Sequence, residues 1–196
     1  MSEPSHPLAG ILLAAGKGSR FDPSGIQNKL LQPLAGGQPV AAAAAKNLLS
    51  VLPRTLAVVR PGATAVAVQL GALGCEVVEC PDAGQGMGAS LAFAIARTAN
   101  AAGWLIALAD MPYVQAATLQ ALIDTIANGA DIAVPTHAGR RGNPVAFSHR
   151  HLPELLALGG DQGARRLLTS YPVMEVAVDD PGIHRDIDTL GDLGEK

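Results

Sequence analysis

Residues 8–20 read Leu8-Ala9-Gly10-Ile11-Leu12-Leu13-Ala14-Ala15-Gly16-Lys17-Gly18-Ser19-Arg20, and this stretch decides the fold. Its first half is an unbroken apolar run, which is typical of a strand buried on both faces of a parallel sheet. Its second half changes to small residues with two glycines and two cations. Glycines let the backbone turn tightly and approach a ligand closely, and backbone N–H groups beside an arginine attract an anion. The stretch therefore predicts a strand that ends in a phosphate-binding loop.

Two common glycine-rich loops do not match this stretch. A P-loop needs a lysine followed by Ser or Thr, whereas Lys17 is followed by Gly18. The dinucleotide-binding fingerprint needs Gly or Ala at its last position, where this chain has Phe21. Residues 13–20, Leu-Ala-Ala-Gly-x-Gly-x-Arg, instead resemble the signature of nucleotidyltransferases, which transfer a nucleoside monophosphate from a nucleoside triphosphate. Taken alone, the stretch is also compatible with an ordinary strand-to-helix turn.

Apolar runs and helix-favouring runs alternate along the rest of the chain. The expected strands are residues 55–59, 75–79, 104–109, 131–135, 144–147 and 173–178. The expected helices are residues 41–49, 63–73, 89–102, an amphipathic segment at 119–126, and two short segments at 152–158 and 164–170. This alternation predicts an α/β fold with one doubly wound, mostly parallel sheet and helices on both faces. We expect one domain over residues 8–196, preceded by a disordered tail over residues 1–7.

Composition and charge exclude several classes of protein. The 196 residues carry a net charge of −3, which supplies no general attraction for nucleic acid. The spacing of Cys75 and Cys80 fits neither a redox pair nor a zinc finger, so we expect both to be buried apolar residues in a reducing compartment. No segment is long and apolar enough to span a membrane, and the N-terminus lacks a basic signal-peptide start. We therefore expect a cytoplasmic protein that binds neither nucleic acid nor membrane.

Asp110 is the second anchor of the expected site, because it directly follows the apolar strand 104–109. Ligands of open α/β sheets bind just beyond the carboxyl ends of such strands, where the phosphate-binding loop also lies if the strands are parallel. A carboxylate that faces bound phosphates requires a bridging hard cation, which implies Mg²⁺. The alternative is that Asp110 caps the next helix.

Cations for a polyphosphate stand close to the opening loop in the sequence. Lys29 and Arg20 are the candidates, although a single lysine is more commonly a solvated surface residue. Ser90 begins a helix after a second glycine-rich loop and could bind a base or ribose, or serve only as an N-terminal helix residue. An NAD-dependent oxidoreductase is disfavoured, because Arg60 stands where the acidic ribose-binding residue would follow the second strand.

Five further motifs follow the opening loop in order along the chain. They are Gly-Gln-Gly-Met-Gly-Ala-Ser-Leu (84–91), Leu-Ala-Asp-Met-Pro-Tyr-Val (108–114), Arg-Gly-Asn-Pro-Val-Ala-Phe (141–147), Gly-Asp-Gln-Gly-Ala-Arg (160–165) and Asp-Ile-Asp-Thr (186–189). With these motifs the chain resembles the molybdenum cofactor nucleotidyltransferases, and most closely their cytidylyltransferase branch. Two departures are Asn143, where many relatives carry His, and Asp22, which follows Phe21 where a glycine is common.

The resemblance implies a role for the residues of each motif. It assigns the triphosphate to Gly16, Gly18, Arg20 and Lys29, and the base to Gly84 and Ser90. It assigns Mg²⁺ to Asp110 and Asp188, so that Arg20, Lys29 and Asp110 are the candidate catalytic residues. It assigns the second substrate to Gly142, Asn143, Pro144, Asp161 and Arg165. In the resembling families an Ala-Ala pair, here Ala14 and Ala15, accompanies cytosine, whereas Ala-Gly accompanies guanine.

The activity implied is transfer of CMP from CTP to the terminal phosphate of molybdopterin, with release of pyrophosphate. A phosphate oxygen is already anionic, so alignment and charge neutralisation suffice and no strong base is needed. The partners would be CTP, or GTP, molybdopterin or the molybdenum cofactor, and a recipient molybdoenzyme. The alternatives are an enzyme of the same fold that uses GTP or a sugar or polyol phosphate, and a non-catalytic chaperone that binds the nucleotide and the cofactor.

The last motif holds two carboxylates in an extended segment. Side chains alternate along such a segment, so His184, Asp186 and Asp188 should share one face, and Arg185 and Ile187 the other. This periodicity nominates Asp186 and Asp188 equally as metal ligands. Asp188 could alternatively cap a short helix that begins after it.

Overall fold

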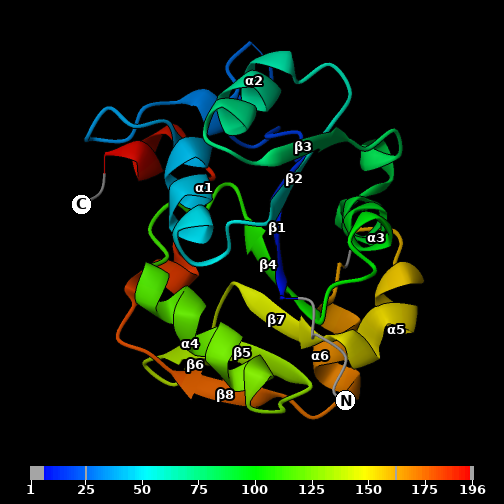
Figure 1. Ribbon diagram of the computed structural model, residues 1–196. Helices are drawn as coiled ribbons and strands as arrows, with labels where there is room; N and C mark the ends of the chain where they lie inside the picture. Colours follow the sequence, from blue (N-terminus) through cyan, green and yellow to red (C-terminus); the bar gives the residue numbers. More distant parts are fainter. Residues whose placement is uncertain (1–6, 25, 162, 195–196) are drawn as a thin grey trace.

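The computed structural model describes residues 7–24, 26–161 and 163–194. A mixed sheet of eight strands runs through the middle of the molecule (Figure 1). The expected tail, residues 1–7, lies outside the described residues except for Pro7. The strands are β1 (Ala9–Ala14), β2 (Thr55–Val59), β3 (Glu76–Glu79), β4 (Gly103–Leu108), β5 (Ile132–His137), β6 (Arg140–Arg141), β7 (Val145–Ser148) and β8 (Met174–Ala177).

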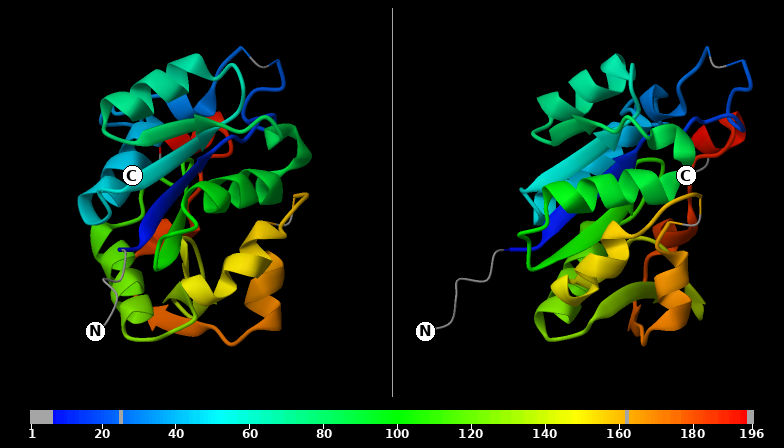
Figure 2. Two further views of the ribbon diagram at one scale, coloured as in Figure 1. Left: turned by 45° about the vertical axis from the view of Figure 1, so that its right-hand side comes forward. Right: turned by 90° about the vertical axis from the view of Figure 1, so that its right-hand side faces the viewer.

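Helices cover both faces of the sheet, as the sequence predicts (Figures 1 and 2). The α-helices are α1 (Val40–Val51), α2 (Thr64–Ala72), α3 (Met87–Arg97), α4 (Ala116–Ala127), α5 (Leu152–Leu156) and α6 (Arg165–Ser170). The short 3₁₀ segments are η1 (Lys29–Leu31), η2 (Ala83–Gln85), η3 (His149–His151), η4 (Pro181–His184) and η5 (Leu190–Leu193). None of the described helices is long and apolar enough to cross a bilayer.

The alternation of side chains along β1 explains the two layers of the core. Leu12 and Ala14 pack with α1, α2 and α4 on one face, and Ala9 and Ile11 pack with α3, α5 and α6 on the other. All four of these side chains are at most 3% exposed. A strand with both faces covered needs apolar residues throughout, which is why the opening stretch identifies the fold.

The sheet order β3-β2-β1-β4-β7-β5-β6, with β8 beside β5, combines two patterns of pairing. Strands β3, β2, β1 and β4 are parallel to one another, and β5 is parallel to β8. β7 is antiparallel to both β4 and β5, and the short β6 is antiparallel to β5. The prediction of a mostly parallel sheet with helices on both faces is confirmed, and β6 is a strand that the sequence did not predict.

One expected helix is too long. Residues 89–102 were expected to form a single helix, but α3 begins at Met87 and ends at Arg97. Thr98 ends it, because its hydroxyl donates to the Ala94 carbonyl at 3.0 Å and accepts from Trp104 Nε1 at 2.9 Å. These contacts end the helix four residues before Ala102, the last of the alanines that suggested a longer helix.

The parallel strands β1 and β4 place the loops that follow them at one edge of the sheet. Leu13 pairs with Leu108, and the Ala109 N–H donates to the Leu13 carbonyl at 3.0 Å just beyond the strands. The chain leaves β1 towards β2 on one side and returns on the other side as β4. Such a switch point is the usual ligand site of an open α/β sheet.

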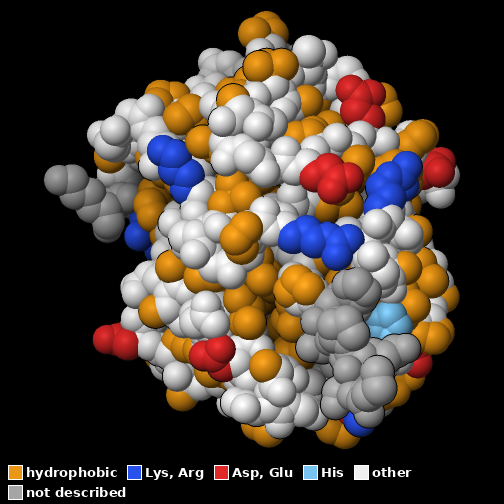
Figure 3. Space-filling view, in the orientation of Figure 1, with side chains coloured by type: hydrophobic (Ala, Val, Ile, Leu, Met, Phe, Trp, Pro, Cys, Tyr) orange, Lys and Arg blue, Asp and Glu red, His pale blue; other side chains and the backbone are white. Residues whose placement is uncertain are grey.

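The cysteines and the visible surface agree with the composition. Cys75 and Cys80 are free and buried, as expected, and burial raises the pKa of the Cys75 thiol to about 11. On the face shown in Figure 3, acidic and basic side chains are scattered among uncharged and hydrophobic ones. This distribution fits the small net charge of −3.

Candidate active site

The loop after β1 passes beside the stem of Lys29 at Gly18. Gly18 has φ +65°, a left-handed conformation that glycine adopts without strain, and an added Cβ would lie 3.6 Å from Lys29 Cγ. The Gly18 carbonyl accepts from the backbone N–H groups of Phe21 and Asp22, at 3.0 and 3.1 Å. A Cβ at Gly16 would meet no heavy atom of the described chain within 4 Å, so this residue borders open space. The loop thus offers its backbone and the Arg20 side chain to the neighbouring cavities.

Four charged side chains from separate segments meet at the edge of the sheet. Lys29 Nζ donates to Asp110 Oδ2 at 2.6 Å and to Asp188 Oδ1 at 3.4 Å. The guanidinium of Arg20 forms an ion pair with the other oxygen, Asp188 Oδ2. The Lys29 side chain is 10% exposed and that of Arg20 is 82% exposed. Lys29 is therefore not a solvated surface lysine but a nearly buried cation between two carboxylates.

Two cavities meet at this charged cluster, and three of its four residues line both of them. The first has a volume of about 540 Å³, and the residues predicted for the nucleotide that line it are Ala14, Ala15, Gly16, Arg20, Lys29, Gly84 and Ser90. The second has a volume of about 760 Å³, and its lining includes Gly18, Asp188, Gly142, Asn143, Asp161 and Arg165. Asp110, Lys29 and Arg20 line both cavities. Two chambers that meet at one charged cluster are suited to bring two substrates together.

The second glycine-rich motif packs directly against the loop before α6. A Cβ on Gly86, which has φ +120°, would lie 2.3 Å from Asp161 Oδ1, and one on Gly88 would lie 2.6 Å from the Gly159 carbonyl oxygen. The Gly88 N–H donates to the Gly160 carbonyl at 2.8 Å. Gly86 and Gly88 are therefore needed for packing against residues 159–161, and not only for the approach of a ligand. Residue 162 of the neighbouring motif lies outside the described residues.

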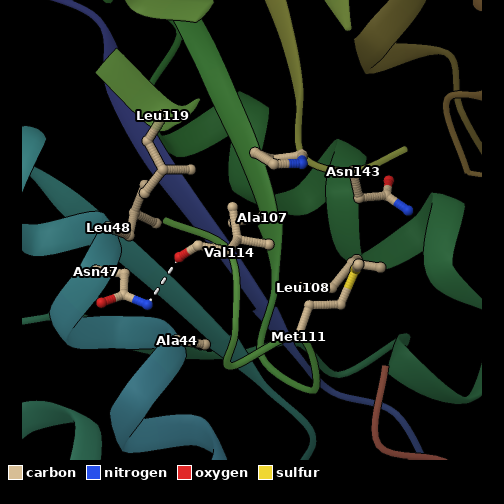
Figure 4. A pocket seen from close by; sticks show the side chains of 10 residues that line it. Ala44, Asn47, Leu48, Ala107, Leu108, Met111, Val114, Leu119 and Asn143 are labelled. Atoms are coloured by element: carbon tan, nitrogen blue, oxygen red, sulfur yellow. Dashed lines mark hydrogen bonds between the residues drawn. The ribbon is translucent and has the colours of Figure 1, made fainter. Parts of the chain in front are cut away.

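Pro144 lies apart from the other residues predicted for the second substrate. Among the cavities described here it lines a small void of about 10 Å³ between α1, α4 and β4, with Asn143 at the border (Figure 4). Asn47 of α1 lies beside this void, and its Nδ2 donates to the carbonyls of Pro112 and Val114 at 3.2 and 2.8 Å. Pro144 thus supports the cavity wall from behind, and Asn47 holds the segment that follows Asp110.

The segment that carries Asp188 is tied to the loop after β4. The Ile187 N–H donates to the Asp110 carbonyl at 2.8 Å, and the Ile187 side chain is 1% exposed. His184, Asp186 and Asp188 all line the larger cavity, whereas Ile187 is buried on the opposite side. The alternation that the sequence predicts for His184, Asp186 and Asp188 is confirmed.

Neither Asp110 nor Asp188 is a helix cap, so both alternative interpretations are wrong. The N-cap of α4 is Gln115, five residues beyond Asp110 in the sequence. The N-cap of η5 is Thr189, which forms a capping box with Asp192. Asp192 Oδ2 also accepts from the N–H of Asp188, at 2.9 Å, and these hydrogen bonds lower the pKa of the Asp192 carboxyl. The Asp188 side chain is left to face Lys29 and Arg20.

The two carboxylates fit a magnesium ion that shares its remaining ligands with a substrate. Asp110 and Asp188 both contact Lys29 Nζ, so their oxygens converge on one region. Within the described residues, no group of three or more His, Cys, Asp and Glu side chains is placed to hold a metal. Mg²⁺ is typically bound by one or two carboxylates together with water and phosphate oxygens. The donor set therefore suits a metal that binds with a polyphosphate.

Sequence reasoning missed several residues of the cavity walls. Met87 lines both large cavities, and Arg140, Arg141 and His184 line the larger one. Arg141 is the first residue of the motif at 141–147 and Arg140 directly precedes it, so this motif was the available signal. Asp180 is 1% exposed, although the Asp-Asp-Pro sequence around it is typical of an exposed turn.

A family model described as a MobA-like NTP transferase domain matches residues 10–176. The purine catabolism protein PucB of Bacillus subtilis (strain 168) is 33% identical over 195 residues, which cover 93% of this chain and 92% of that protein.

Several solved structures have a similar fold over nearly the whole chain. The structure of Rv0371c from Mycobacterium tuberculosis H37Rv has a TM-score of 0.82 at 30% identity and covers 96% of each chain. A manganese complex of Rv0371C has a TM-score of 0.78 at 31% identity and covers 95% of each chain. The molybdopterin-guanine dinucleotide biosynthesis protein A of Archaeoglobus fulgidus shares the fold, with a TM-score of 0.69 at 20% identity and 95% of each chain covered.

Proposed function

This chain belongs to the MobA-like NTP transferase family, and on that premise we propose that it transfers CMP from CTP to the terminal phosphate of molybdopterin. The observation that carries the proposal is the charged cluster of Lys29, Arg20, Asp110 and Asp188, of which the first three line both cavities and Asp188 lines the larger one. One cavity would hold the nucleotide and the other the acceptor, so the two substrates would meet at this cluster. The products are the cytidine dinucleotide form of the cofactor and pyrophosphate.

The smaller of the two cavities is the proposed nucleotide site. The Gly16 backbone lines this cavity and the Gly18 backbone lines the adjoining larger one, and we propose that their N–H groups bind the polyphosphate while Arg20 and Lys29 neutralise its charge. Gly84 and Ser90 lie on the part of the wall proposed to face the base. We propose CTP rather than GTP because Ala15, which is 8% exposed, carries a methyl group at the position where, by the resemblance described above, glycine accompanies guanine. This methyl group narrows the cavity, so that the smaller cytosine fits there better than guanine.

The proposed displacement needs no general base. An acceptor phosphate oxygen forms a bond to the α-phosphorus of CTP, the bond from that phosphorus to the bridging oxygen breaks, and pyrophosphate leaves with the electron pair. Lys29 and Arg20 stabilise the negative charge that develops on pyrophosphate. Asp110 and Asp188 would hold Mg²⁺, which supplies further charge neutralisation and orients the phosphates. Because Lys29 contacts both carboxylates, we propose that it leaves them and turns to the phosphates when metal and nucleotide bind.

The larger cavity is the proposed acceptor site. Gly142, Asn143, Asp161 and Arg165 line it, and Pro144 supports its wall from behind. Asn143 offers an amide in place of the histidine common in the resembling family, so it would bind the acceptor rather than transfer a proton. Arg140 and Arg141 add positive charge at the same wall, which suits an anionic acceptor.

The name of the Bacillus subtilis relative connects that protein with purine catabolism. We extend this connection to the present chain and propose that its product serves a molybdoenzyme of purine breakdown in the cytoplasm. The two free, buried cysteines are compatible with a reducing compartment. Neither the nucleotide nor the acceptor has to differ from the proposal for this extension to hold.

The test is pyrophosphate release by the purified protein with Mg²⁺, purified molybdopterin and each of CTP, GTP, ATP and UTP in turn. We expect release with CTP and molybdopterin together and none with either alone. Release that is faster with GTP would replace the nucleotide in the proposal. Release with a sugar or polyol phosphate instead of molybdopterin would replace the acceptor. Tight binding of nucleotide and molybdopterin without any release would identify a chaperone.

A further inference from the structure

Asp180 is a buried carboxylate outside the charged cluster. Its side chain is 1% exposed and accepts three hydrogen bonds. Oδ2 accepts from the Gln115 N–H at 2.8 Å and from the Thr118 hydroxyl at 2.7 Å, and Oδ1 accepts from the Gly182 N–H at 2.9 Å. Burial of a carboxylate is costly unless such donors satisfy it. Gln115 and Thr118 begin α4, whereas Gly182 belongs to η4, so Asp180 joins two segments that are far apart in the sequence.

A simple helix cap would not require this arrangement. The N-cap residue of α4, Gln115, makes no side-chain capping bond, and the carboxylate that binds its N–H comes from 65 residues away. A Ser or Asp at position 115 would cap the helix locally and remain partly solvated. The remote carboxylate fixes the C-terminal segment as well as the helix.

Further contacts hold the segment 180–188 along the loop after β4. A Cβ on Gly182 would lie 2.2 Å from the Tyr113 carbonyl oxygen, so this contact allows only glycine. The Arg185 guanidinium lies 4.1 Å from the centre of the Tyr113 ring. The Ile187 N–H reaches the Asp110 carbonyl at 2.8 Å. The segment therefore begins at the Asp180 contacts, follows the loop, and ends with Asp188 beside Asp110.

We propose that Asp180 is a positioning residue for the metal site, which it serves by fixing the place of Asp188 relative to Asp110. The inference rests on the proposed function, because it takes Asp110 and Asp188 as the metal-binding pair. Asp110 needs no such help, since it stands two residues beyond β4 and Asn47 holds the residues that follow it. Asp188 follows no strand, and its position depends on the contacts that begin at Asp180.

The substitution Asp180→Asn tests this role without removing the side chain. Both oxygens of Asp180 accept hydrogen bonds, whereas an Asn has one oxygen and one NH₂ group. In the variant the NH₂ group must therefore point at an N–H or O–H donor, and at least one of the three hydrogen bonds is lost. We expect Mn²⁺ affinity, titrated on the full chain and followed by the signal of free Mn²⁺ in electron paramagnetic resonance, to fall about tenfold or more. Extra Mg²⁺ should restore much of the lost turnover, which a role limited to stability would not produce.

Two reference variants make the result decisive. Thr98→Val removes a buried hydroxyl that bonds Ala94 and Trp104 at the opposite end of β4, and it should bind Mn²⁺ like the parent protein. Asp188→Asn should lose Mn²⁺ binding. If Asp188→Asn binds Mn²⁺ normally, the metal assignment and with it the proposed function fail. If Asp188→Asn loses binding while folded Asp180→Asn keeps it, only the inference about Asp180 is overturned.

A less disruptive variant tests the inference if Asp180→Asn does not fold. Thr118→Val removes one of the three donors and keeps the carboxylate with both backbone N–H groups. Its circular dichroism should match the parent protein, and its Mn²⁺ affinity should lie between those of the parent protein and Asp188→Asn. Parent-like Mn²⁺ affinity in folded Thr118→Val, when Asp180→Asn is unfolded, would contradict the inference.

Discussion

Asp110 and Asp188 both contact Lys29, but they reach it by different means. Asp110 stands two residues beyond β4, and the parallel pairing of β4 with β1 carries it to the phosphate-binding loop. Asp188 lies on an irregular segment held in place by hydrogen bonds that the Asp180 and Asp192 carboxylates accept and that the Ile187 N–H donates. The first position follows from the sheet and the second from tertiary contacts. The two carboxylates should therefore respond differently to changes in their surroundings.

The largest effect should come from Asp110→Asn. This change removes a carboxylate from both cavities but keeps the shape of the side chain, so turnover should fall by about a thousandfold or more. The thermal midpoint should stay close to that of the parent protein, because the sheet places the residue. The measurement is the rate of pyrophosphate release over a range of Mg²⁺ concentrations, together with thermal unfolding.

Asp124→Asn is the matched control for this prediction. Asp124 lies on α4, where it accepts from Gln120 Nε2 at 2.8 Å, and it lines neither large cavity. Its variant should keep the turnover of the parent protein. Turnover of Asp110→Asn within a few-fold of that control would remove Asp110 from the catalytic machinery.

The second effect separates the two carboxylates of the C-terminal segment. Asp188 contacts Lys29 and Arg20, whereas Asp186 is an exposed residue on the wall of the same cavity. Asp188→Asn should lower turnover about a hundredfold with partial rescue by extra Mg²⁺, and Asp186→Asn should lower it only a few-fold. The rate of pyrophosphate release at several Mg²⁺ concentrations measures both. Equal losses would mean that the metal uses both side chains.

The parts of the site that could be predicted depend on local sequence. An apolar strand followed by small residues and cations identifies β1 and its loop, because a strand buried on both faces has a distinctive composition. The same reasoning finds Asp110 at the end of β4. The sharing of one face by His184, Asp186 and Asp188 follows from the alternation of side chains along an extended backbone, and the structure confirms it.

The parts that could not be predicted depend on contacts between distant segments. Nothing near Lys29 in the sequence indicates that its amine lies between two carboxylates 81 and 159 residues away. Asp180 follows another aspartate and precedes a proline, a pattern of exposed turns. It is nevertheless buried, and it accepts hydrogen bonds from donors at the start of α4. The two-residue strand β6 has no periodicity to detect. Periodicity describes how a segment meets its surroundings but not which segment it meets.

The smallest expected effect concerns the capping box that follows Asp188. Asp192 Oδ2 accepts from the N–H groups of Asp188 and Thr189 at 2.9 and 2.6 Å, and these bonds lower the pKa of the Asp192 carboxyl. A carboxyl whose pKa is lower in the folded chain adds stability above its unfolded pKa of about 3.9, and this stability is lost as the pH falls through the lower folded pKa. Asp192→Asn should therefore lower the thermal midpoint slightly at pH 7, since solvent screens this exposed site.

The pH dependence makes this last prediction specific to the carboxylate. The difference in thermal midpoint between the parent protein and Asp192→Asn should be constant at neutral pH and shrink as the pH falls below about 3.9, because the parent carboxyl then becomes protonated. Thermal unfolding of both proteins from pH 7 to acid pH measures it, and titrations that the two proteins share cancel in the difference. A difference that grows on acidification would contradict the hydrogen bonds to Asp188 and Thr189. A loosened segment should also raise the Mg²⁺ requirement of Asp192→Asn, because the capping box holds the backbone of Asp188 and leaves that of Asp110 untouched.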